Sequence, residues 1–99
     1  MNASAIPHAQ FRFRLYVAGE TPNSAQALAN LTQMCRTCLP GRHEIEVVDV
    51  FQHPERALAE SIFMTPTLLK LGPPPLRRIV GTLSNESTVL AAMGLTHGA

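Results

Sequence analysis

The pattern that most constrains the fold is a strand, a long helix and a second strand in the first half of the chain. Residues 11–17 alternate between apolar and polar side chains, which is typical of a strand with one buried face. A helix is predicted to begin at Thr21, as its N-cap, and Pro22, and to end before Gly41, which is free to adopt a left-handed backbone. Residues 45–50 are rich in β-branched side chains and predict a second strand. Because a helix joins them, the two strands should be parallel with a right-handed crossover.

The second half of the chain predicts shorter elements. A short helix is expected over 54–61, a strand over 65–71 and an antiparallel strand over 76–80. A last helix follows the cap Ser84-Asn85-Glu86, with Val89, Leu90 and Met93 on its core side. The order β-α-β-α-β-β-α is that of a thioredoxin-like α/β fold. We predict one domain over residues 11–94, flanked by flexible tails at 1–10 and 95–99.

Composition excludes several classes of partner. The formal charge of +1 gives no electrostatic reason to bind nucleic acid or an anionic membrane. No apolar run approaches the roughly 20 residues that span a bilayer, and the first ten residues do not resemble a signal peptide. Two cysteines are too few for a secreted disulfide scaffold. The sequence therefore predicts a protein of the cytoplasm.

Cys35-Arg36-Thr37-Cys38 is a C-x-x-C motif, so thiol–disulfide chemistry has to be considered. A reactive thiolate is usually placed at a helix N-terminus, where the helix dipole favours negative charge. In the predicted helix that position is held by Thr21–Ser24, and both cysteines lie near the opposite end. They also continue the stripe of Leu28 and Leu31, which favours a role as small core residues. An oxidoreductase using Cys35 and Cys38 is kept as the alternative function.

No other group of residues predicts catalysis or a cofactor. The four histidines are scattered and show no paired-ligand spacing, although a zinc site combining the cysteines with His43 or His53 stays open. Asp49 lies in an apolar strand, where a carboxyl group can have a perturbed pKa, but a single carboxylate defines no reaction. The remaining histidines are His8 and His97. We expect no enzymatic activity, no metal and no cofactor.

The third and fourth predicted strands are joined by a segment rich in proline and bordered by basic residues. X-Pro bonds isomerise slowly, on the order of tens to hundreds of seconds, so this stretch could either slow a rearrangement or form a plain rigid turn. Basic side chains near a rigid turn can dock an acidic partner surface, or can simply protect a strand edge. The prolines are Pro66, Pro73, Pro74 and Pro75, and the basic residues are Lys70, Arg77 and Arg78.

Several of these segments together, in order, resemble the KaiB family of circadian clock proteins. They are Leu15-Tyr16-Val17-Ala18-Gly19, Thr21-Pro22-Asn23-Ser24, Val48-Asp49-Val50, Thr65-Pro66-Thr67-Leu68, Pro73-Pro74-Pro75-Leu76-Arg77-Arg78-Ile79-Val80-Gly81 and Leu83-Ser84-Asn85. The resemblance implies a non-enzymatic protein that binds the ATPase KaiC. It also implies a fold switch in which the second half, with its prolines, refolds between a resting form, often a tetramer, and a thioredoxin-like monomer.

The chain departs from the clock proteins at three places. Residues 58–64 lack the acidic and lysine character common in the family, Thr82 stands where aspartate is usual, and there is no acidic C-terminal tail. A timer or stress role with KaiC but without KaiA is therefore an alternative to a daily rhythm. A binding module for an unrelated protein is the third hypothesis. The resemblance also implies that the resting form is a homotetramer or a homodimer.

Overall fold

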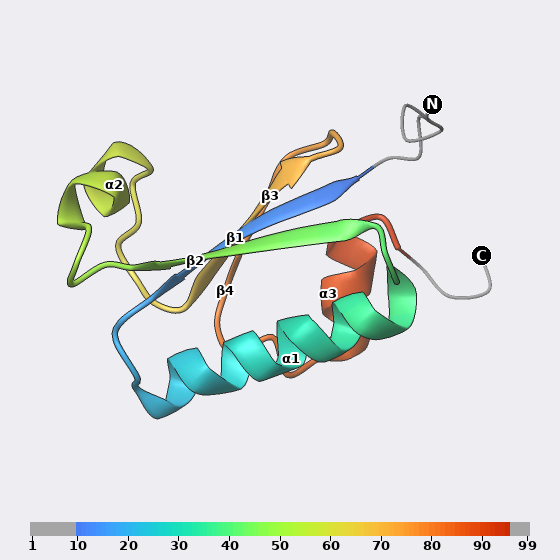
Figure 1. Ribbon diagram of the computed structural model, residues 1–99, viewed down its shortest axis with the longest axis horizontal. Helices are drawn as coiled ribbons and strands as arrows, with labels where there is room; N and C mark the ends of the chain where they lie inside the picture. Colours follow the sequence, from blue (N-terminus) through green and yellow to red (C-terminus); the bar gives the residue numbers. More distant parts are fainter. Residues whose placement is uncertain (1–9, 96–99) are drawn as a thin grey trace.

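A computed structural model describes residues 10–95, and its chain order matches the predicted one (Figure 1). The predicted tails lie outside the described residues except for Gln10, which is exposed, and Leu95, which packs against the core. The elements are β1 (Phe11–Val17), α1 (Pro22–Cys38), β2 (His43–Asp49), α2 (Pro54–Ala59), β3 (Thr67–Gly72), β4 (Arg77–Val80) and α3 (Glu86–Ala92).

The strands form one mixed sheet in the order β2-β1-β3-β4. β1 and β2 are parallel, as the connecting helix requires, and Arg14 lies opposite Glu46. β3 runs antiparallel to both β1 and β4, so the predicted hairpin of β3 and β4 is confirmed. The first half of the chain thus supplies one edge of the sheet and the second half supplies the other.

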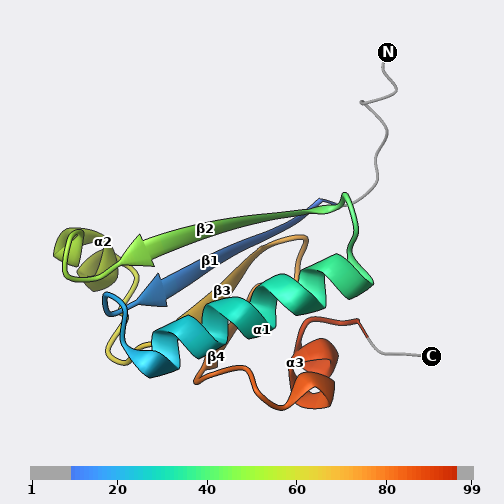
Figure 2. The same cartoon turned by 60° about the horizontal axis from the view of Figure 1, so that its bottom comes forward.

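α1 and α3 cover one face of the sheet and enclose the larger core (Figure 2). Val89, Leu90 and Met93 of α3 are buried there, as predicted. On α1 the prediction was only partly right. The buried stripe runs through Ser24, Ala27, Leu31, Met34 and Cys35, whereas Leu28 is 36% exposed. The helix packs through its small residues near its start, which turns the larger Leu28 to the margin of the contact.

The opposite face is covered by α2, at the end of the sheet where β1 and β2 finish (Figure 2). A smaller apolar cluster lies beneath it, formed by Tyr16, Val48, Ala57, Ile62 and Leu69. Because α2 has only six residues, the rest of this face is left without a covering helix. β1 is therefore buried on both faces near its end, where Tyr16 and Val17 are both buried, rather than on one face as its alternation predicts.

The two predicted helix caps differ in outcome. Asn85 accepts a hydrogen bond from the Thr88 backbone N–H at 3.1 Å, as an N-cap does. Thr21 occupies the N-cap position of α1, but its hydroxyl donates to Ser24 Oγ and makes no capping bond to the backbone. Within residues 10–95, no helix is long and apolar enough to cross a membrane.

Candidate functional site

The cysteines lie at the C-terminal end of α1, as the sequence predicted. Cys35 is 1% exposed within the core, and Cys38 is half-buried. Burial raises the pKa of Cys35 from 9.0 to about 11, and the neighbouring Cys38 adds to the rise. A thiol with so high a pKa supplies little thiolate at neutral pH, so Cys35 lacks the activation that thiol exchange requires.

The N-terminus of α1, where a reactive sulfur is placed in thiol redox proteins, is occupied by hydroxyl groups. Ser24 Oγ accepts hydrogen bonds from the Ala18 N–H at 3.1 Å and from the Thr21 hydroxyl at 3.0 Å. Asp49 joins the same end of the sheet, and its Oδ1 accepts from the backbone N–H groups of Gly19 and Phe51. These bonds fix the turn after β1. Asp49 therefore has a structural role in shaping the loops.

The histidines are not brought together with the cysteines. His43 places its Nδ1 2.7 Å from the carbonyl oxygen of Leu39, and His53 faces Glu55 at 3.7 Å. Among residues 10–95, no three His, Cys, Asp or Glu side chains are grouped as metal ligands would be. His8 and His97 lie outside the described residues.

The proline segment forms the approach to β3 and the turn between β3 and β4. Pro66 directly precedes β3, and its carbonyl oxygen accepts from the Gly81 N–H at 2.9 Å. Pro73, Pro74 and Pro75 make the turn of the hairpin. The peptide bonds Thr65–Pro66, Gly72–Pro73 and Pro74–Pro75 are cis.

Lys70 does not belong to the basic surface that the sequence suggested. Its side chain is 3% exposed, because β3 is an inner strand and Lys70 faces the larger core. The ammonium Nζ donates to the carbonyl oxygen of Met93 at 3.0 Å and lies 5.3 Å from the centroid of the Phe11 ring. Burial lowers the pKa of Lys70, and the nearby Arg77 lowers it further. The residue ties β3 to the end of α3 and is closed to a partner.

Arg77 and Arg78 are both exposed but differ in what they contact. Among the residues that the structure describes, the Arg77 guanidinium donates to one acceptor, the carbonyl oxygen of Leu76, at 3.1 Å. Arg78 reaches across to the end of α2, where its guanidinium donates to the carbonyl oxygens of Glu60 at 2.7 Å and Ser61 at 2.9 Å. These two residues follow directly after α2, at its C-cap and one position beyond it. That either arginine contacts a partner stays a prediction.

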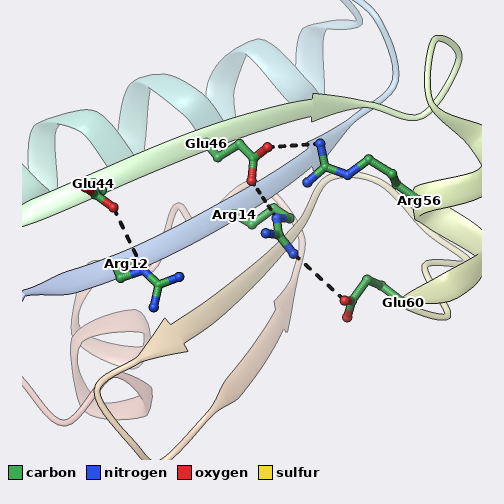
Figure 3. Close-up of polar contacts among 6 residues, drawn as sticks. All are labelled: Arg12, Arg14, Glu44, Glu46, Arg56 and Glu60. Atoms are coloured by element: carbon green, nitrogen blue, oxygen red, sulfur yellow. Dashed lines mark hydrogen bonds and ion pairs between the residues drawn. The ribbon is translucent and has the colours of Figure 1, made fainter.

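Sequence reasoning missed a charged cluster on the face that α2 only partly covers (Figure 3). Glu46 accepts from Arg14 Nε at 2.7 Å through one carboxylate oxygen and lies 2.9 Å from Arg56 Nη1 through the other. Glu60 approaches Arg14 Nη1 at 3.9 Å. These bonds lower the pKa of Glu46 to about 2, the bond from Arg56 being the larger cause.

A signal for this cluster was present in the sequence. Arg12 and Arg14 are spaced by two residues on one strand, and so are Glu44 and Glu46 on its parallel neighbour. Side chains two residues apart lie on the same face of a strand, so a correct register brings the two pairs together. The outer pair, Arg12 and Glu44, is 3.9 Å apart and does not reach α2.

Comparison with known proteins gives a consistent result. The KaiB domain model matches residues 14–95. The circadian clock protein KaiB3 of Synechocystis sp. is 43% identical over 82 residues, which cover 83% of this chain and 80% of that protein. The circadian clock oscillator protein KaiB of Prochlorococcus marinus is 43% identical over 89 residues, covering 90% of this chain and 76% of that protein.

Solved structures confirm the thioredoxin-like fold. The N-terminal domain of SasA from Synechococcus elongatus aligns with a TM-score of 0.72 at 17% identity, covering 93% of this chain and 90% of that domain. Chloroplastic thioredoxin z aligns with a TM-score of 0.73 at 17% identity, covering 87% of this chain and 78% of that protein. At such identities the likeness concerns the fold alone.

Proposed function

The chain belongs to the KaiB family, and from this premise we propose that it is a clock or timing protein that binds and regulates a KaiC-type ATPase. The observation that carries the proposal is the match of nearly the whole fold to relatives named circadian clock proteins, at 43% identity. In this proposal residues 11–94 act as one binding domain and catalyse no reaction.

The β3–β4 hairpin is the proposed contact surface. Arg77 is exposed and forms no ion pair within residues 10–95, so its charge is free to meet an acidic group. Leu76 beside it is 65% exposed. A cationic and apolar pair on a proline turn matches a partner surface with a carboxylate next to an apolar patch, and it loses little freedom on binding.

The proposal includes a slow change of fold in the second half of the chain. The elements there are short: six residues in α2, four in β4 and seven in α3, against seventeen in α1. Isolated helices below about 12–15 residues are marginal, so these elements depend on tertiary packing. Two packings of such a segment can therefore differ by only a few kcal/mol, as fold switching requires. The other packing would form the resting homotetramer or homodimer.

Complex formation with the KaiC-type ATPase of the same organism tests the binding. The chain is incubated for a day with the ATP-bound ATPase and run on a size-exclusion column. We expect co-elution, and we expect Arg77→Ala to weaken the affinity about tenfold. Arg36→Ala, which removes an exposed arginine from the last turn of α1 and outside the β3–β4 hairpin, is the matched control and should bind as wild type. Absence of a complex with the wild-type chain would overturn the proposal.

NMR spectroscopy of the free protein tests the change of fold. We expect two slowly exchanging sets of backbone peaks for residues 54–92 and a single set for residues 11–49. Addition of the ATPase should increase one set over hours. Light scattering on the same sample gives the resting mass. A single set of peaks throughout, before and after addition, would contradict the fold switch while leaving the binding result standing.

The oxidoreductase alternative is not favoured. Several structural neighbours are thioredoxins, but that likeness concerns the fold alone. Cys35 is buried at the C-terminal end of α1, and its raised pKa opposes thiolate formation. Binding to an unrelated protein in place of the ATPase would support the third hypothesis, a general binding module.

A further inference from the structure

Helix α2 is held on the sheet by little apolar contact. Ala57 is the buried residue within the helix, and Ile62 follows it, whereas Leu58 is 74% exposed. Six residues cannot sustain a helix alone. The hydroxyl of Tyr16, in the apolar cluster below, is buried with no hydrogen-bond partner among the described residues. The apolar contact beneath α2 is therefore small.

Charged groups from three strands oppose release of α2. Glu46 of β2 places one carboxylate oxygen on Arg14 of β1 and the other on Arg56 of α2 (Figure 3). Arg78 of β4 donates to the carbonyl oxygens of Glu60, the C-cap of the helix, and of the residue after it. A cation at a helix C-terminus also interacts favourably with the helix dipole. Arg14, Glu46, Arg56 and Arg78 are called the α2 clamp below.

The clamp joins the two halves of the chain. Arg14 and Glu46 come from β1 and β2, and Arg56 and Arg78 come from the segment after them. Glu46 pairs with two arginines, so its loss leaves Arg56 with no acidic partner among the described residues and Arg14 with only Glu60, at 3.9 Å. These contacts link the firmly packed first half of the chain to the weakly packed second half. They therefore affect the equilibrium between the state in which the second half is packed on the sheet and the state in which it is released.

We propose that the α2 clamp is a positioning device, which keeps α2 on the sheet and thereby sets the fraction of molecules in the thioredoxin-like, partner-binding form. The link to binding rests on the proposed function, whereas the hold on α2 does not. When only a fraction of molecules is competent to bind, the apparent affinity falls by that fraction. Weakening the clamp therefore weakens binding without removing any contact with the partner.

The same sheet face offers a matched control. Arg12 and Glu44 belong to the same two strands and lie two residues before Arg14 and Glu46, but they do not reach α2. Glu44→Gln removes the same charge, from the same strand, as Glu46→Gln. The two variants differ in whether the lost carboxylate binds α2.

Hydrogen exchange measured by mass spectrometry on the free, full-length chain at neutral pH tests the clamp. In Glu46→Gln we expect the backbone amides of residues 56–62 to exchange about tenfold faster, while α1 exchanges as in wild type. Glu44→Gln should stay within twofold of wild type in both segments. Equal exchange of residues 56–62 in the two variants, or an equal increase throughout α1, would overturn the clamp.

Binding of the two variants to the ATPase, measured by titration, tests the link to function. We expect Glu46→Gln to bind about tenfold more weakly and Glu44→Gln to bind as wild type. Faster exchange of α2 with unchanged affinity would overturn the link between clamp and binding. If wild type itself forms no complex, the proposed function fails, and the exchange data still decide whether the clamp holds α2.

Discussion

Alkylation of the two cysteines with iodoacetamide separates a binding protein from a thiol enzyme. The reagent reacts with the thiolate, so its rate follows the thiolate fraction. Burial raises the pKa of Cys35 from 9.0 to about 11, which lowers that fraction about a hundredfold at pH 8. Because the sulfur is also closed to the reagent in the core, we expect the folded chain to react at Cys35 at least a hundredfold more slowly than the unfolded chain.

In the wild-type chain the label on each cysteine can be quantified separately, because trypsin cleaves after Arg36 and places Cys35 and Cys38 in different peptides. The chain is labelled at pH 8 with and without guanidinium, digested, and the label on each peptide is quantified by mass spectrometry. The rate at Cys35 in the folded chain should increase with pH up to about 11. A folded-state rate within tenfold of the unfolded rate at pH 8 would refute the argument that this thiol is inactive.

Three further predictions concern stability, measured by urea denaturation. Leu90→Ala, in the larger core at 2% exposure, should lower the free energy of unfolding by about 2–5 kcal/mol, and a loss below about 1 kcal/mol would contradict its placement. Asn85→Ala should cost about 1 kcal/mol by removing the cap of α3, whereas Asn85→Ser should retain most of it. The pKa of Glu46 is about 2 when folded and near 4.5 when unfolded, so its pairing stabilises above pH 4.5 and is lost as the pH falls from 4.5 towards 2. The Glu46 side chain is 46% exposed and screened by solvent. In Glu46→Gln the free energy of unfolding should therefore fall by only about 1 kcal/mol less than in wild type between pH 4.5 and 2. The same pH profile in variant and wild type would contradict the pairing.

The first half of the fold follows closely from its local sequence. Alternation in β1, the β-branched residues of β2 and the Pro22 start of α1 are short-range signals. β1 and the start of α1 appear where they are predicted, whereas β2 spans 43–49 rather than the predicted 45–50. Parallel pairing follows from the length of the connection alone. The position of both cysteines near the C-terminal end of α1 was predictable for the same reason, because it follows from where the helix begins and ends in the sequence.

Features that depend on tertiary packing were not predictable. Leu28 continues an apolar stripe, yet α1 packs through Ser24 and Ala27, and a periodic pattern cannot say which edge of a stripe is buried. Lys70 was expected at the surface because charged side chains rarely enter a core without a partner. That partner, the carbonyl oxygen of Met93, lies 23 residues away in the chain.

The charged face of the sheet shows a third limit. The pairs of Arg12 with Glu44 and Arg14 with Glu46 follow from strand register, which the sequence contains only as matching spacings. The contact of Arg56 with Glu46 also depends on α2 lying over this face. Nothing in six helical residues specifies that position, so the α2 clamp could be found only in three dimensions.

The central claim is that this chain acts by binding a protein surface and needs neither sulfur. The most direct measurement is the dissociation constant of the cysteine-free variant, with Cys35→Ala and Cys38→Ser, for the KaiC-type ATPase. We expect a value within about threefold of wild type, because Cys35 is enclosed in the core and neither cysteine lies in the proposed contact surface. Loss of binding by a variant that keeps the wild-type fold, or a disulfide reductase activity that disappears with the cysteines, would contradict the account.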